Sequence, residues 1–445
     1  MKTPRLAALA AMLGISSAGS AAGLLLGQAP LTPDTGSVAV HCGALVDGSS
    51  DTARRDVTVT IRNGRVESLL DGRRADSDLP FLELGGYTCL PGLIDMHTHL
   101  TDLPSDTVDL RVYYTRSREK QLQISEGNAA ATLAAGFTTV RNVGTYIAWT
   151  DRDLRDAINQ GKAIGPRMQI VGFYLTIPGG GGDLVIPGVA EKDIPVIVRM
   201  GVARNPAEFR AKAQLAVDGG ADLLKVIASG AVLAYGGVPS APEMTQDEIA
   251  AVVEVAHAAG LRVAAHAHGA QSIKDAILAG ADTVEHASYI NAEDIALAKA
   301  HNVALSMDVY NGDYTDTAGR KAHEPEEFLR KNIETTEVQR QGFTKALAAG
   351  VPMVFGTDAS VYPHGLNARQ FPIMVARGMT PMQAIKSATS TAAHYMGWDG
   401  RVGRLAPGLF ADLIAVRGDP LKDITRLQHV SVVIKGGIPF RLPGK

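Results

Sequence analysis

The chain has 445 residues and a mass of 46.8 kDa, a length that suits one barrel-sized domain with a smaller companion domain. Hydrophobic residues make up 46% of the sequence and charged residues 20%, a balance that excludes a disordered chain. The 43 basic and 46 acidic side chains give a net charge of −3, so the composition favours neither a nucleic acid nor an anionic membrane as the partner.

The first residues are typical of an export signal. Lys2 and Arg5 precede an apolar run, and small residues continue to Ala22, where cleavage is expected. An N-terminal membrane anchor is the alternative, because apolar residues resume at positions 24–26. We expect a cleaved signal over residues 1–22 and, in a bacterium, a mature protein that is periplasmic or secreted. No other stretch reaches the ~18 apolar residues that would span a membrane, so no membrane association is expected after cleavage.

Segments rich in β-forming residues lie at both ends of the remaining chain: 38–46, 57–61, 66–70, 412–416 and 430–434. Between the second and third of these, Asn63-Gly64 is a strong hairpin signal. We expect residues 37–89 and 404–443 to form one small β-sandwich domain. The only two cysteines, Cys42 and Cys89, exclude a disulfide framework and a cysteine-rich zinc site, but leave one disulfide and two buried thiols as alternatives.

From residue 90 to residue 403, a strand, a loop and a helix alternate. The buried-strand candidates are 90–97, 138–143, 167–173, 222–228, 262–268, 282–287, 303–309 and 351–358. Helix starts are marked by capping patterns, such as Asn205 followed by Pro206. Eight such units favour an α/β fold with a closed (β/α)8 TIM-like barrel. An open doubly wound sheet is the alternative. It would be expected to carry a glycine-rich phosphate loop after the first strand, which instead ends in His97-Thr98-His99.

Residues able to bind metal stand at five strand ends, where barrels of this kind place their active sites. His97 and His99 alternate onto one face of the first strand and can bind one metal ion. Lys225 lies in an apolar strand, where a buried ammonium is costly. A burial-lowered pKa would free its amine to add carbon dioxide, and the resulting carbamate could bridge two metals. The remaining strand ends carry His266 with His268, His286 and Asp358.

Together these residues resemble the amidohydrolase superfamily, over about residues 37–443. The resemblance is carried by residues 90–99, by Lys225, His266 and His286, and by Gly356-Thr357-Asp358. It implies two divalent metal ions, usually zinc, with a bridging hydroxide as the nucleophile. The more buried metal would bind His97, His99 and Asp358. The second would bind His266 and His286, and carboxylated Lys225 would bridge the pair. Asp358 would also move the proton to the leaving amine, and His268 is the next candidate for that role.

The segments 226–230 and 266–269 most resemble the branch of bacterial Xaa-Pro dipeptidases and ochratoxin-hydrolysing amidases. This resemblance implies cleavage of an amide or peptide bond in a small substrate: a dipeptide, an N-acyl amino acid or an ochratoxin-like amide. The expected substrate contacts are Tyr235, which could bind a carboxylate, together with His268 and His364. Gly181 stands where this branch tends to carry a histidine, a difference that His268 or His364 could compensate.

Two other functions stay open. One is a cyclic amide or lactone hydrolase of the same superfamily, similar to imidazolonepropionase, although that branch normally acts in the cytoplasm. The other is a non-catalytic barrel that binds a ligand, which five complete strand ends argue against. The expected partner is a small-molecule substrate, with no nucleic acid. The sequence does not specify the native metal, the natural substrate or whether the chain forms a homo-oligomer.

Overall fold

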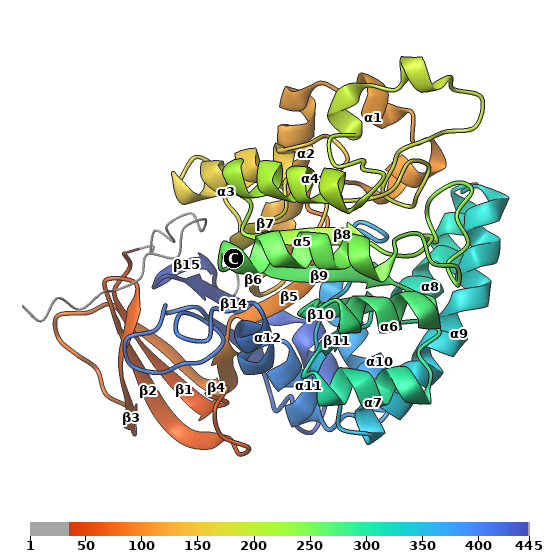
Figure 1. Cartoon of the computed structure of the whole chain (residues 1–445). Helices are drawn as coiled ribbons and strands as arrows, with labels where there is room; N and C mark the ends of the chain where they lie inside the picture. The colour runs from red at the N-terminus through yellow and green to blue at the C-terminus, as the bar shows by residue number, and fades with distance from the viewer. Residues whose placement is uncertain (1–34, 444–445) are drawn as a thin grey trace, which may run out of the picture.

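The computed structural model describes residues 35–443, in which a parallel α/β unit lies beside a mostly antiparallel sheet (Figure 1). The expected signal over residues 1–22 lies outside this part of the chain. Among the described residues, no helix is both long enough and apolar enough to cross a membrane.

Both ends of the chain contribute to the mostly antiparallel sheet. Its seven strands are β1 (Val38–Leu45), β2 (Arg54–Arg62), β3 (Arg65–Asp71), β4 (Phe81–Pro91), β13 (Leu413–Arg417), β14 (Val430–Lys435) and β15 (Ile438–Arg441). Their order is β15-β14-β13-β4-β1-β2-β3, and only β1 and β4 pair in parallel. The strands expected for the β-sandwich thus form one continuous sheet. Asn63 and Gly64 connect β2 to β3 with φ angles of 48° and 75°, as the hairpin signal predicts.

The sheet buries side chains on both faces where it meets the parallel unit. Along β13, Ile414 and Val416 join the core of the parallel unit, whereas Leu413 and Ala415 join a second core on the opposite face. This alternation follows the two-residue period of a strand. In the second core a disulfide between Cys42 and Cys89 links β1 to β4, which decides between the two alternatives for these cysteines.

Eight parallel strands form the other unit: β5 (Leu93–Thr98), β6 (Phe137–Asn142), β7 (Arg167–Ile170), β8 (Leu223–Ile227), β9 (Arg262–Ala267), β10 (Thr283–His286), β11 (Ala304–Ser306) and β12 (Met353–Val354). They make a three-stranded sheet, β5-β6-β7, and a five-stranded sheet, β12-β11-β10-β9-β8. Parallel bridges Leu175–Val226 and Thr98–Ala359 link the two sheets at both margins. Each predicted strand segment overlaps one of these strands, so the α/β class with parallel sheets is confirmed.

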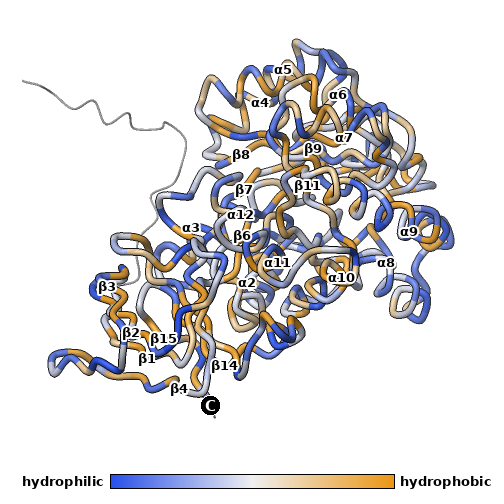
Figure 2. Tube along the Cα trace, turned by 90° about the horizontal axis from the view of Figure 1, so that it is seen from below, coloured by the Kyte–Doolittle hydropathy of each residue, from blue (hydrophilic) through white to orange (hydrophobic). Residues whose placement is uncertain are grey.

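Helices cover the outside of the parallel strands (Figure 1). They are α1 (Val112–Thr115), α2 (Arg118–Ala134), α3 (Thr150–Asn159), α4 (Pro206–Asp218), α5 (Gln246–Ala258), α6 (Ala270–Leu278), α7 (Ala292–Ala300), α8 (Asn311–Tyr314), α9 (Glu326–Ala348), α10 (Gln370–Ala376), α11 (Pro381–Ser387) and α12 (Ser390–Tyr395). The predicted cap of α4 is present, since the Asn205 side chain accepts a hydrogen bond from the Glu208 amide. Hydrophobic residues concentrate along strands such as β8 and β9, while α9 shows many hydrophilic residues (Figure 2).

Candidate metal centre

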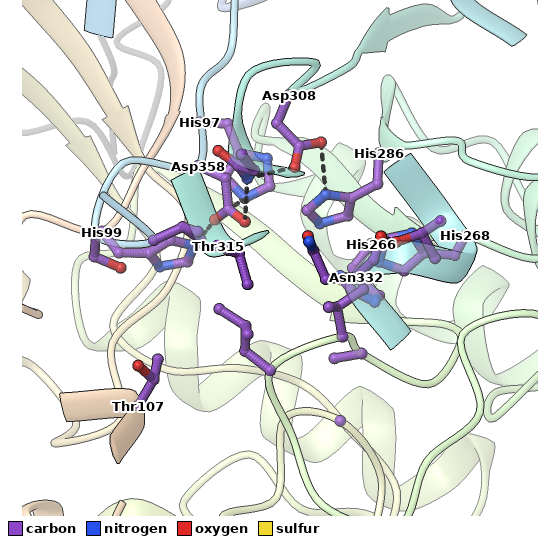
Figure 3. A pocket seen from close by; sticks show the side chains of 18 of the residues that line it. His97, His99, Thr107, His266, His268, His286, Asp308, Thr315, Asn332 and Asp358 are labelled. Atoms are coloured by element: carbon purple, nitrogen blue, oxygen red, sulfur yellow. Dashed lines mark hydrogen bonds and ion pairs between the residues drawn. The ribbon is translucent and has the colours of Figure 1, made fainter. Parts of the chain in front are cut away.

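The carboxyl ends of the parallel strands open into one cavity (Figure 3). All seven side chains predicted at the strand ends line it: His97, His99, Lys225, His266, His268, His286 and Asp358. They come from four strands, β5, β8, β9 and β10, and from the segment that follows β12. The cavity therefore gathers donors that lie more than 250 residues apart in the sequence.

The ligand atoms form two overlapping groups. His97, His286 and Asp358 place one ligand atom each within 4.8 Å of one another, and so do His266, His268 and His286. Nε2 of His99 lies 2.9 Å from Oδ1 of Asp358. The imidazoles of His266 and His268 both lie 4.5 Å from that of His286, measured between ring centroids, so proximity does not favour one over the other as a ligand.

Four of the histidines are anchored at Nδ1, which leaves Nε2 for a ligand, and one of them is His268, whose Nδ1 lies 2.8 Å from Oγ of Ser288. Nδ1 of His97 donates to Oε2 of Glu285 at 2.9 Å, and Nδ1 of His286 donates to Oδ1 of Asp308 at 2.9 Å. Nδ1 of His99 donates to the Gly144 carbonyl oxygen at 3.2 Å. Metal-binding histidines are usually held in this way, because the second hydrogen bond fixes both the tautomer and the ring orientation.

Lys225 is buried, and its Nζ has no hydrogen-bond partner among the described residues. Burial lowers the pKa of this amine to about 8. Burial, followed by the neighbouring His286 and His268, also lowers the pKa of His266 well below its ordinary value. A neutral imidazole and an amine without a partner suit a metal site, because both groups must lose their charge to take part in one. The donor set therefore fits divalent metal ions.

Asp358 follows β12 with a φ angle of 56°, which is unusual for a residue with a side chain. Its backbone N–H donates to the His97 carbonyl oxygen at 2.7 Å, and buried Asp95 accepts a hydrogen bond from the Thr357 hydroxyl at 2.6 Å. These bonds hold the carboxylate against His97 in β5 and against His99, which directly follows this strand. Burial alone would raise the pKa of Asp358, but His97 and His99 outweigh it and keep that pKa well below its ordinary value.

A buried ion pair that was not predicted from the sequence lies behind the site. Nη2 of Arg141, on β6, donates to Oε1 of Glu285 at 2.6 Å, and both side chains are buried. Burial favours a neutral Glu285, but Arg141 and then His97 hold the pKa of this carboxyl well below its usual range. A charged residue inside an apolar strand was the signal that identified Lys225, and the same signal could have identified these two residues.

Two predicted substrate contacts lie elsewhere. Tyr235 does not line the cavity, because its ring packs against Phe328 with centroids 4.9 Å apart. His364 does not line it either: this side chain is buried, with Nδ1 3.5 Å from Oγ1 of Thr132 on α2. Gly181 does line the cavity, and its backbone N–H donates to Oε2 of Glu243 at 2.8 Å.

Three tyrosines that were not predicted as site residues from the sequence form part of the cavity wall. The ring centroids of Tyr113 and Tyr146 are 4.8 Å apart, and those of Tyr146 and Tyr174 are 5.3 Å apart. The row reaches the metal ligands, since the Tyr174 hydroxyl lies 3.1 Å from Nδ1 of His99.

Comparison with known proteins identifies the class. Residues 88–438 match the Amidohydrolase family, and the chain belongs to this family. A crystal structure of a Xaa-Pro dipeptidase with bound methionine is 34% identical and superposes with a TM-score of 0.85, covering 91% of this chain and all of that one. Ochratoxinase from Aspergillus niger is 28% identical over 433 residues, 91% of this chain and 87% of the relative, and its crystal structure gives a TM-score of 0.81. Imidazolonepropionase from Cereibacter sphaeroides is 27% identical over 389 residues, which cover 80% of this chain and 87% of that protein.

Proposed function

We propose that the protein is a binuclear metal-dependent amidohydrolase that cleaves an amide or peptide bond in a small substrate. The observation that carries the proposal is the set of histidines anchored at Nδ1 around the cavity, together with Lys225 and Asp358. Dipeptides, N-acyl amino acids and ochratoxin-like amides are the substrates to test first, given the similarity to a Xaa-Pro dipeptidase and to ochratoxinase.

The proposed ligands of one metal are His97, His99 and Asp358. His266 and His286 bind the other metal, and His268 is the alternative to His266. Two zinc ions held there would supply an activated water and polarise the scissile carbonyl. Nδ1 anchoring by Glu285, Asp308 and the Gly144 carbonyl group would hold the imidazoles in place.

Lys225 would complete the site as a carbamate. The neutral Nζ attacks carbon dioxide, an N–C bond forms, and one proton leaves to solvent, so the group becomes an anion with two donor oxygens. Within residues 35–443, Nζ has no hydrogen-bond partner, and its pKa is lowered to about 8; both observations support this step.

Asp358 would transfer the proton. Its carboxylate is kept ionised and can therefore accept a proton from the attacking water and deliver it to the departing nitrogen. Nδ2 of Asn311 lies 3.3 Å from Oδ2 of Asp358 and can orient this oxygen. His268 is the second candidate for the role, since it lines the same cavity.

We further propose that the eight parallel strands are a (β/α)8 barrel over residues 90–403. Residues 37–89 and 404–443 would be the β-sandwich domain, with the seven-stranded sheet folded over the core that contains Cys42 and Cys89. Residues 1–22 would be removed during export to the periplasm or medium. The Cys42–Cys89 disulfide supports an oxidising compartment. Hydrolysis of a cyclic amide is the second candidate function, because imidazolonepropionase is among the relatives.

The test combines metal analysis with a panel of amides. We expect two metals per chain and hydrolysis of at least one amide, and we expect Asp358→Asn to lower kcat by ~10²–10⁴-fold while metal is retained. For an activated ester, kcat should fall less, because the leaving group of an ester needs no proton. Asp71→Asn, at a surface position in β3, is the matched control and should leave kcat unchanged. Wild-type kcat in Asp358→Asn with both metals bound would exclude this role for Asp358.

A further inference from the structure

The cavity extends beyond the candidate metal ligands. In Figure 3 the labelled histidines and Asp358 lie along the upper part of the view, while Thr107 lies below them. This outer part must hold whatever the substrate carries beside its scissile bond. Its chemistry therefore indicates which substrates fit.

One wall of the outer part is aromatic and aliphatic. It contains the row Tyr113, Tyr146 and Tyr174, with Leu103, Leu110 and Leu233 beside it. Hydroxyl groups of this row already have neighbours, since the Tyr113 hydroxyl donates to Asp106 at 3.1 Å and that of Tyr174 lies beside His99. The wall thus offers mainly ring faces and aliphatic carbons to a substrate.

Positive charge is scarce in the cavity. Among the described residues that line it there is no arginine, and the only lysine is Lys225, which belongs to the candidate metal centre. Asp102 lines the cavity as well, and its carboxyl group supplies no positive charge. Nothing on the outer wall can therefore form an ion pair with a substrate carboxylate.

Cations close to the cavity wall are engaged in other contacts. Arg116 pairs with Asp106 at 2.6 Å. Nζ of Lys331 lies 2.7 Å from Glu327 and donates to the Ala234 carbonyl oxygen at 2.7 Å. Neither Arg116 nor Lys331 lines the cavity, and Tyr235, the residue expected to bind a carboxylate, does not line it either.

We infer that the natural substrates are amides whose groups on both sides of the scissile bond are uncharged, with an apolar or aromatic group against the Tyr113–Tyr146–Tyr174 wall. A carboxylate placed there would lose its hydration without gaining a cation, and this loss weakens binding. The inference rests on the proposed function, but it replaces the carboxylate-bearing substrates named there, free dipeptides and N-acyl amino acids, with uncharged amides.

Matched substrate pairs test the inference on the metal-loaded enzyme. N-acetylphenethylamine differs from N-acetylphenylalanine only in lacking the carboxylate on the amine side. N-butanoylphenethylamine lacks the carboxylate that N-succinylphenethylamine carries on the acyl side. We expect kcat/KM to be at least ~10-fold higher for the uncharged member of each pair, because a charged group left without a partner is costly. Equal rates, or faster hydrolysis of the acids, would overturn the inference.

A charge introduced into the wall gives a second test. Val232 lines the cavity and is only partly buried, so a longer side chain can be accommodated there. Val232→Lys should shift the preference toward the acids by at least ~10-fold relative to Val232→Met, which has similar length and no charge. An unchanged ratio in a folded, metal-loaded Val232→Lys protein would count against the inference.

Failure of the proposed function gives a different result. If no amide is hydrolysed with two metals bound, the amidohydrolase proposal fails. Titration calorimetry with the same four compounds would still measure which member of each pair binds, and tighter binding of the acids would overturn the inference by itself.

Discussion

Glu285 holds His97 in place, and its substitution offers the sharpest test of the site. The carboxylate is fully buried and accepts three hydrogen bonds: from His97 at 2.9 Å, from Arg141 at 2.6 Å and from Thr283 at 2.5 Å. Glu285→Gln keeps the shape but removes the charge, and the new amide group directs a donor toward a neighbour that is itself a donor. Arg141 is then a buried cation with no counter-ion.

Two effects of Glu285→Gln should be measurable. Removing one partner of a buried ion pair typically costs about 3–5 kcal/mol, so the free energy of unfolding of the metal-free protein should fall by that amount in a urea titration. Losing the group that orients a metal-binding histidine typically lowers metal affinity ~10–100-fold, which competition with a chelator would measure.

Glu83→Gln is the matched control for this substitution. Glu83 also lies between a histidine and an arginine, His41 at 2.6 Å and Arg73 at 2.7 Å, but its side chain is 48% exposed. Water can replace these partners, so the control should lose about 0–1 kcal/mol and keep wild-type metal affinity. If Glu285→Gln unfolds and binds zinc as Glu83→Gln does, the buried hydrogen bonds do not hold the metal centre.

Three further changes have defined outcomes. Burial raises the pKa of Asp102 to about 8, so the folded protein keeps a proton that the unfolded chain releases above about pH 4, and stability falls as the pH rises through that window. Asp102→Asn should therefore flatten this dependence and raise the Tm at pH 8. Gly181→His should not improve amide hydrolysis, because a Cβ at this position would lie 2.9 Å from that of Ala231, and overpacking of this kind costs about 1–3 kcal/mol. Replacing Cys42 and Cys89 together by alanine should cost about 4 kcal/mol, since the disulfide joins residues 47 apart in sequence.

For each of these three predictions, one experimental result would contradict it. Thermal melts between pH 4 and pH 9 would contradict the first if Asp102→Asn kept the wild-type profile. Higher kcat/KM on amides in Gly181→His would show that the loop accommodates the ring. Unchanged urea midpoints for the double alanine variant, and for the wild type after reduction, would show that the disulfide does not contribute to the free energy of unfolding.

Much of the fold could be predicted from local patterns. The Asn63-Gly64 turn requires the left-handed backbone that glycine and asparagine tolerate, so its hairpin is encoded by two residues. The parallel strands appear as apolar runs between helices with defined caps. Their ends were predicted less well: β12 covers only Met353–Val354 because the chain then leaves the sheet to place Asp358.

Residues of the candidate site could be predicted where an unusual residue pattern is confined to a short stretch of sequence. A lysine in an apolar strand, or two histidines on one face, is visible in a few residues. Tyr235 and His364 lie in loops, and the direction of a loop side chain depends on distant partners such as Phe328 and Thr132. The contact between Arg141 and Glu285 joins strands 144 residues apart, so its pairing could not be inferred without the fold.

The sheet built from both chain ends has a consequence for synthesis. The Thr88 hydroxyl on β4 donates to the carbonyl oxygen of Gly418, 330 residues further along the chain. At ~5–20 residues per second, a ribosome needs on the order of tens of seconds to add them, and until β13 arrives one edge of β4 stays open to other strands. A chain terminated just before β13 would contain every candidate metal ligand and still expose that edge. Until β13 pairs with it, this edge of β4 can therefore form hydrogen bonds with a strand of another chain.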